Sequence, residues 1–391
     1  MKQHLTSCKY PCTRNIGING FGSFLEKEIA EPRRNIQLFA KELSRIISGG
    51  IEDISGQMVL TNSGSSANLA AALAIAERLR RNNRPLTAVA SAFTFPTTIS
   101  ALLLAAFDVS LIDTEKQGFN LSVDELEKMQ DIPSLVVCTH FLGFPADMKR
   151  LVQYKTRTGC IILQDACETL VSHFKGKPLY QYGDIITWSF YHPHHLSSYG
   201  GGAIYAKDRD DFILCDSMAH WGRACKCHID RKLCKVTYGP GHQFTYENIG
   251  VNVEMSELNA CFGRWQLMDW DRIEEQRKRN YSFLYGKLKN NARMKVWDFY
   301  NEEKDSPFVF PVLSYNKTIN EAWDILSRKG IEIRTLMGGA ASMQKAYRRI
   351  ISGNRNFPNA EYMSRHAFFV GCHHTLTQDD VQQIATALGG L

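Results

Sequence analysis

Short apolar runs alternate with longer helix-like stretches between residues 55 and 206. The runs that predict strands are 57–62, 86–90, 108–113, 134–140, 160–165, 184–190 and 201–206. The stretches that predict helices are 65–82, 99–107, 122–130 and 147–157. This alternation predicts an α/β fold with a mostly parallel sheet covered by helices on both faces. Ligands of such sheets bind at the carboxyl ends of the strands.

The pattern changes after Met255, where helical periodicity continues over 256–288. We predict one long helix that joins the sheet domain to a smaller domain. Strand-like and helix-like runs then alternate to the C-terminus, which is typical of a small α+β domain. The predicted division is a large domain over residues 1–265, with the N-terminal arm included, and a small domain over residues 266–391.

Composition narrows the class of protein. The 391 residues are 44% hydrophobic and 22% charged, as in an average globular protein. The net charge is +6, but charges of both signs alternate along helix-like stretches, so we expect no binding of nucleic acid. No apolar run approaches the length of a membrane span, and the first residues lack the apolar core of a signal peptide. We therefore expect a cytoplasmic protein whose eleven cysteines are reduced.

Two polar sites follow predicted strands. The turn at Gly64 leads into a helix, and backbone amides there, with the hydroxyls of Ser65 and Ser66, suit a phosphate group. An ordinary serine cap gives the same pattern. Asp165 ends an apolar run, so it lies at the edge of the sheet where a carboxylate can pair with the nitrogen of a pyridoxal-type ring. A second helix cap is the alternative there.

Histidines and cysteines supply further candidate chemistry. The segment 189–203 holds three histidines, which could bind a metal or include one catalytic base. Cys225, Cys227 and Cys234 lie close together in the sequence, and Cys167 stands far upstream near Asp165. Thiolates bind iron–sulfur clusters or zinc, whereas unrelated buried cysteines are the alternative.

Six segments, in this order, resemble the DegT/DnrJ/StrS-type sugar aminotransferase family of fold-type-I vitamin B6 enzymes. They are SGSSANLAAAL (63–73), FTFPTTISALLLAAFDVSLID (93–113), THFLGFPADM (139–148), QDACETL (164–170), SFYHPHHLSSYGGGA (189–203) and IGVNVEMSELNACFG (249–263). The resemblance implies a mostly parallel seven-stranded sheet domain. Within the family the chain is most similar to the 3-dehydratase branch, because His194 stands where aminotransferases carry their cofactor-binding lysine.

The resemblance assigns roles around pyridoxal or pyridoxamine 5′-phosphate. Gly64, Ser65 and Ser189 would hold the cofactor phosphate. Phe95 would stack on the ring, and Asp165 would pair with its nitrogen.

Three further roles come from the same resemblance. Glu168 would contact the ring near its hydroxyl group. Asn252 would reach the phosphate of the neighbouring subunit, which implies a homodimer. A lysine would bind the aldehyde form of the cofactor covalently, whereas His194 cannot, although its titration near neutral pH allows it to move the same proton. The implied reaction is the 3-dehydration of a keto-sugar, nucleotide-linked as in the family, with pyridoxamine 5′-phosphate as cofactor.

The cysteines match the [2Fe–2S] enzymes of this branch, which act on CDP-4-keto-6-deoxyglucose. The resemblance makes Cys167, Cys225, Cys227 and Cys234 the cluster ligands, with one residue deleted before Cys234. It also implies reductive deoxygenation and a separate NAD(P)H-dependent flavin or iron–sulfur reductase. Dehydration or amine transfer without reduction, with zinc or no metal at the cysteines, stays open. A catalytically silent protein that binds a ligand or a metal is the other alternative.

Some positions depart from the family. The family's glycine–glutamate–glycine–glycine motif is Tyr199, Gly200, Gly201 and Gly202 here, so its first glycine and its glutamate are replaced. Glu254 replaces a basic residue, and Val251 replaces an aromatic one. These positions lie around the substrate side of the implied site. Arg334 resembles a family arginine, although a buried salt bridge would explain it nearly as well.

Overall fold

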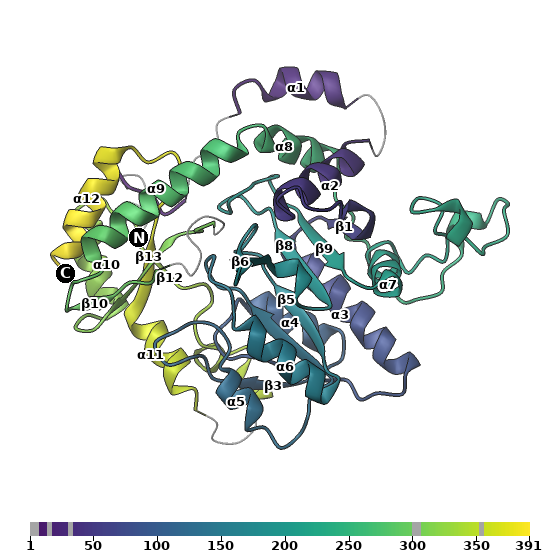
Figure 1. The fold of residues 1–391 in the computed structure, drawn as a ribbon, viewed down its shortest axis with the longest axis horizontal. Coiled ribbons are helices and arrows are strands. Elements are labelled where there is room, and N and C mark those ends of the chain that lie inside the picture. The colour runs from purple at the N-terminus through teal and green to yellow at the C-terminus, as the bar shows by residue number, and fades with distance from the viewer. Residues whose placement is uncertain (1–7, 14–17, 30–33, 299–305, 352–355) are drawn as a thin grey trace.

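The computed structural model describes residues 8–13, 18–29, 34–298, 306–351 and 356–391. A seven-stranded sheet forms the centre of the large domain (Figure 1). Its strands in spatial order are β1 (Met58–Thr61), β9 (Gly202–Ala206), β8 (Ile185–Ser189), β5 (Ile161–Asp165), β4 (Leu135–Thr139), β2 (Thr87–Ser91) and β3 (Asp108–Ile112). Only β9 runs against its neighbours, so the predicted mostly parallel sheet is confirmed.

Helices cover both faces of this sheet because apolar side chains point alternately to each side. Leu135 and Val137 of β4 belong to the core that includes the alanine-rich helix α3, and Val136 between them belongs to the opposite core. The first face packs against α3 (Gly64–Arg81), α4 (Pro96–Leu104) and α7 (Arg209–Ala219). The second face packs against α2 (Arg34–Ile47), α5 (Val123–Glu127), α6 (Met148–Thr158) and α8 (Glu257–Leu267).

The expected single helix over 256–288 is wrong in one respect. The structure divides it into α8 and α9 (Trp270–Leu288), which follow each other along the top of Figure 1. Asp269 lies between them with φ −110° and ψ 13°, outside the helical region, and its carboxylate accepts a hydrogen bond from Arg272. Aspartate favours helix starts over helix interiors, which accounts for the break.

A four-stranded antiparallel sheet organises the C-terminal part of the chain. Its order is β10 (Met294–Lys295), β11 (Phe310–Ser314), β13 (Ala367–Val370) and β12 (Arg334–Thr335). The N-terminal segment also lies here, because Tyr10 pairs with Ile331 and the Cys12 amide donates to Glu332. The helices of this part are α10 (Ile319–Ser327), α11 (Pro358–His366) and α12 (Gln378–Gly389). The division at residue 265 stays a prediction.

Minor elements complete the described chain. They are α1 (Phe21–Glu28), the hairpin of β6 (His173–Phe174) and β7 (Lys177–Pro178), and the 3₁₀ turns η1 (Ser55–Gln57), η2 (Leu179–Gln181), η3 (Arg231–Leu233), η4 (His242–Phe244), η5 (Ala341–Met343) and η6 (Arg348–Ile350). No helix in the described ranges is both long and apolar enough to cross a lipid bilayer.

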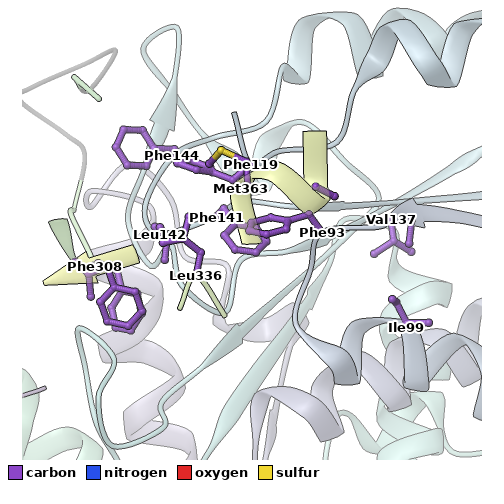
Figure 2. Packing of buried hydrophobic residues seen from close by; sticks show 14 of the residues in the cluster. Phe93, Ile99, Phe119, Val137, Phe141, Leu142, Phe144, Phe308, Leu336 and Met363 are labelled. Atoms are coloured by element: carbon purple, nitrogen blue, oxygen red, sulfur yellow. The ribbon is translucent and has the colours of Figure 1, made fainter. Parts of the chain in front are cut away.

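Aromatic side chains join the large sheet to the C-terminal part (Figure 2). Phe141, which follows β4, stacks on Phe93 with ring centroids 5.3 Å apart and an interplanar angle of 26°. Leu336 and Met363 of the C-terminal part lie in the same cluster, and Phe308 lies beside it. Phe119 of the large domain contacts Trp297 of the C-terminal part, with ring centroids 5.0 Å apart. Aromatic contacts add to the energy of burial, so this junction holds the C-terminal part against the large domain.

Candidate functional site

A cavity of about 510 Å³ opens at the carboxyl ends of β5 and β8. Residues from the C-terminal part, among them Arg334 and Phe369, form part of its wall. The cavity also brings together these predicted site residues: Gly64, Ser65, Phe95, Asp165, Cys167, Glu168, Ser189 and His194.

One wall of the cavity is the N-terminus of α3. Ser63 caps this helix, since its hydroxyl accepts a hydrogen bond from the Ser66 amide. A Cβ atom on Gly64 would lie 2.5 Å from Ser189 Cβ and 2.7 Å from Cys167 Sγ, so only glycine fits without displacement. Backbone amides at a helix N-terminus attract anions. This wall therefore suits a phosphate group, as the sequence predicts.

Asp165 forms the buried floor of the cavity, with 3% of its surface exposed. Its Oδ2 accepts hydrogen bonds from Asn68 Nδ2 at 2.8 Å and from Thr98 Oγ1 at 2.6 Å. Thr187 in turn donates to the amide oxygen of Asn68. The carboxylate is thereby fixed in one orientation, as a partner of a ring nitrogen must be. Sequence reasoning missed Asn68 and Thr98, although Asn68 lies one helical turn after Gly64.

Glu168 is the second buried carboxyl of the cavity. Burial raises its pKa well above the ordinary value, and the charge of Asp165 adds to this effect. One oxygen accepts a hydrogen bond from the Leu142 amide at 3.1 Å. A carboxyl that holds a proton can donate a hydrogen bond to a bound group.

The three histidines of the 189–203 segment have different surroundings. His194 lines the cavity, and its Nδ1 lies 3.1 Å from the Ser189 carbonyl oxygen. His195 is buried, and its Nε2 lies 2.7 Å from the carbonyl oxygen of Ser306, so it anchors the loop. The ring of His192 lies 5.7 Å from that of Tyr199. Of the three, His194 alone contributes to the described lining.

Two predicted cofactor residues lie toward solvent. Phe95, just before α4, is 46% exposed and lies at the mouth of the cavity. Asn252 is exposed and lies outside the lining, where its backbone pairs with that of His220. Its predicted role concerns a neighbouring subunit, so that role stays a prediction.

The four predicted cluster cysteines fall in two places. Cys167 lies in the cavity against Gly64, and burial raises the pKa of its thiol well above the ordinary value. Cys225, Cys227 and Cys234 instead converge with His242, and the four ligand atoms all lie within 4.8 Å of one another. The structure thus groups three of the four expected ligands, and a histidine that sequence reasoning missed completes the group.

The departures from the family motifs also have definite places. Arg334 lines the cavity, and its exposed side chain donates to Glu332 at 2.7 Å. The expected buried salt bridge is therefore wrong, and the role of a family arginine stays a prediction. Tyr199 is an exposed residue with φ +56°. The carboxylate of Glu254 lies 3.8 Å from His220 Nε2.

Known proteins share this fold, and some are similar in sequence over most of their length. An E. coli GDP-4-keto-6-deoxy-D-mannose-3-dehydratase, solved with bound hydrated PLP, superposes with a TM-score of 0.85 over 97% of this chain and 99% of that chain, at 20% identity. In sequence, the chain is 25% identical to the lipopolysaccharide biosynthesis protein RfbH of Salmonella typhimurium, over 89% of this chain and 83% of the relative. It is 24% identical to a GDP-4-keto-6-deoxy-D-mannose 3-dehydratase of Escherichia coli O55:H7, over 84% and 87%.

A family model provides the strongest of these comparisons, because it covers most of the described fold. The model of the DegT/DnrJ/EryC1/StrS aminotransferase family matches residues 37–389. The match includes both the large sheet and the C-terminal sheet, together with most of the cavity lining. The chain belongs to the DegT/DnrJ/EryC1/StrS aminotransferase family.

Proposed function

We propose that the protein is a pyridoxamine-5′-phosphate-dependent 3-dehydratase of a nucleotide-linked keto-sugar. The family and its relatives support a PLP-dependent sugar-modifying enzyme, which leaves a dehydratase or an aminotransferase. One observation favours the dehydratase. Among the described residues that line the cavity there is no lysine, and His194 faces the cavity from the loop after β8. An aminotransferase needs a lysine that can bind the cofactor covalently.

The residues present fit the cofactor. The N-terminus of α3 and the side chain of Ser65 would hold the phosphate, and the missing side chain at Gly64 leaves space for it. Asp165, oriented by Asn68 and Thr98, would keep a proton on the ring nitrogen. When bound, the cofactor supplies an amine that reacts with ketones and a ring that withdraws electrons.

His194 would move the proton at the C4′ carbon of the cofactor. A proton on Nδ1 that is donated to the Ser189 carbonyl leaves Nε2 as the basic nitrogen. The ring also packs edge-on against Phe308, with centroids 5.1 Å apart, so its orientation is restricted. A base of fixed orientation in a partly enclosed cavity is suited to repeated transfer of one proton.

The proposed substrate class is supported by the names of related proteins. Two of them are called GDP-4-keto-6-deoxy-D-mannose 3-dehydratases, and one from Saccharopolyspora spinosa is a dTDP-4-dehydro-2,6-dideoxy-D-glucose 3-dehydratase. We include the keto-sugar in the proposal and leave the nucleotide to the experiment. Asn252 is exposed, which is compatible with a second copy of the chain as its partner, so the homodimer stays a prediction.

Reductive deoxygenation through a [2Fe–2S] cluster, with its separate reductase, also stays a prediction. The four-cysteine ligand set that it needs does not fit the described geometry, because Cys167 lies outside the group formed by the other three cysteines. We therefore propose dehydration without electron transfer through a cluster.

The test is the rate of hydrogen exchange at C4′ in a His194→Asn variant. We expect the loss of a C4′ deuterium label, and the dehydration of GDP- and dTDP-linked 4-keto sugars, to slow by about 10² to 10⁴. Cofactor binding should persist, because the α3 and Asp165 contacts remain. His192→Asn is the matched control, since His192 shares the loop but does not line the cavity. Unchanged exchange in His194→Asn, or a pyridoxyl-lysine after borohydride treatment of the parent protein, would contradict the proposal.

A further inference from the structure

The segment between α7 and α8 contains a second candidate site, outside the cavity. We call residues 222–250 the cysteine segment; in Figure 1 it projects from the body of the protein beyond α7. Cys227 Sγ lies 3.7 Å and Cys234 Sγ lies 3.2 Å from His242 Nε2, while Cys225 Sγ lies 3.9 Å from His242 Nδ1. None of these four residues lines the cavity.

We propose that Cys225, Cys227, Cys234 and His242 bind one zinc ion in tetrahedral coordination. Zinc–sulfur bonds of 2.3 Å and zinc–nitrogen bonds near 2.0 Å place the ligand atoms of one tetrahedron about 3.6 Å apart. The distances from His242 Nε2 to the sulfurs of Cys227 and Cys234, 3.7 and 3.2 Å, bracket this value. The Cys225 sulfur lies 3.9 Å from the other ring nitrogen, and the four ligand atoms, one from each residue, all lie within 4.8 Å of one another. Three thiolates and one imidazole are also a common ligand set of structural zinc sites.

A two-iron cluster fits this geometry less well. In such a cluster each iron takes two protein ligands, and the iron–sulfide core separates the two pairs. Here all four ligand atoms lie within 4.8 Å of one another, so a single ion matches the spacing better. Cys167, the remaining ligand of a four-cysteine set, packs against Gly64 at the cavity.

Few buried side chains stabilise the cysteine segment. The structure describes all of residues 222–250, and within them only Gly222, Cys225, Lys226 and His242 are buried. None of these is an aliphatic or aromatic hydrophobic side chain that could nucleate a core. Small units without a sufficient core usually depend on a metal or on disulfides. Two of the four buried residues are proposed ligands, so the interior of the segment is the metal site itself.

The base of the segment positions the ligands. The Ala224 amide donates to the Thr245 carbonyl at 2.9 Å, which brings the two ends of the segment together. Lys226, between the first two cysteines, pairs with Glu247 at 2.7 Å. His242 contacts the cysteines, and it lies three residues before Thr245, whose carbonyl accepts the hydrogen bond at the base. The ligands therefore lie near the base of the segment, where one ion can link its N-terminal and C-terminal parts.

The test is metal analysis of the full chain purified without oxygen. We expect about one zinc per chain and no acid-labile sulfide, as for a single structural ion. Cys225→Ser and His242→Ala should each lose most of the zinc, while Cys167→Ser should keep it. His366→Gln is the histidine control, because His366 belongs to neither group of possible metal ligands among the described residues.

A cobalt titration tests the same site in the parent protein, so its result does not depend on whether the variants fold. Cobalt(II) added to the metal-free parent protein should give the strong visible bands of a tetrahedral thiolate site, and zinc should remove them. Two irons and two sulfides per chain that are lost in Cys167→Ser would overturn the proposal in favour of a four-cysteine cluster. The absence of any bound metal, or full zinc retention in His242→Ala, would also overturn it. Metal content and C4′ exchange are measured independently. A negative result in one assay therefore contradicts only the proposal that this assay tests.

Discussion

The cavity over the large sheet and the cysteine segment are held in shape by different interactions. The cavity stands on the ends of buried strands, and its key carboxylate, Asp165, accepts hydrogen bonds from two side chains of packed helices. The cysteine segment contains no strand or α-helix, and polar or sulfur-bearing side chains fill its interior. Packed strand ends therefore hold the residues of the cavity in place without a ligand, whereas the proposed metal site would depend on its ion for order.

Removal of the metal should have the largest effect, and it should affect the cysteine segment but not the cavity. Structural zinc in small peptides contributes about 10 to 16 kcal/mol at neutral pH, far more than the other contacts of such a segment. We therefore expect chelation to increase tryptic cleavage at Arg231, Lys232 and Lys235, which are exposed in the segment, by about tenfold or more. Cleavage at Arg81, in the last turn of α3, is the internal control and should not change. Equal cleavage rates with and without metal would show that the segment needs no ion.

The contact between α7 and the cysteine segment, which we call the joint, should show the next largest effect when its central carboxylate is replaced. Asp216 is buried, and its carboxylate lies 2.9 Å from His228 Nε2 and 3.2 Å from His220 Nδ1. Burial alone would raise the pKa of Asp216, but hydrogen bonds from the two histidines outweigh it and hold the pKa below its ordinary value. Asp216→Asn should weaken this joint by about 1.5 to 3 kcal/mol, which hydrogen exchange of the segment can measure. Asp210→Asn, an exposed change on the same helix, is the control.

The same joint has a defined pH dependence. Burial lowers the pKa of His220, but the contacts with Asp216 outweigh this effect and raise it, with a smaller contribution from Glu254. Stability from such a histidine is complete below the unfolded pKa near 6.5 and is lost as the pH rises through the folded value. Protection of the segment should thus decrease with rising pH in the parent protein and much less in Asp216→Asn. The same decrease in both proteins would contradict the assignment.

The smallest of these effects concerns the cavity alone. Gly64→Ala adds a Cβ atom that meets Ser189 and Cys167, so we expect a loss of about 1 to 3 kcal/mol in the free energy of unfolding, with weaker cofactor binding. Denaturant unfolding and cofactor titration would measure both. Gly286→Ala in α9 is the control, since its new Cβ atom meets nothing within 4 Å. Zinc content should stay the same in both variants.

The sequence predicts the large sheet well because each strand is a short apolar run between helix signals. The predicted segments match β1 to β5, β8 and β9 to within about a residue or two at each end, as is usual for such boundaries. The break at Asp269 escapes prediction, because periodicity continues across it and only the backbone angles reveal it. Helix α5 is also shorter than its pattern, since apolar periodicity does not fix where fraying begins.

The cavity residues are predictable where a motif marks them, and not where tertiary packing selects them. Gly64, Asp165 and His194 stand at strand ends or in distinctive turns, so their position follows from the sequence. Thr98 and Phe308 reach the site only through the crossing of elements that are distant in the chain. His242 belongs to the same class, since no fixed spacing links it to the cysteines that it meets.

The lining of the cavity comes from both extremes of the chain, from Thr13 to Phe369. A wall assembled from such distant segments closes only after Phe369 has left the ribosome, because long-range contacts form after local ones. The last described strand of the large sheet ends at Ala206, so this sheet can form earlier in synthesis. The carboxyl ends of its strands would then stay uncovered until the C-terminal part folds. Enclosure of a cofactor would then mark the completion of folding, and truncated chains would be recognisable by their failure to retain it.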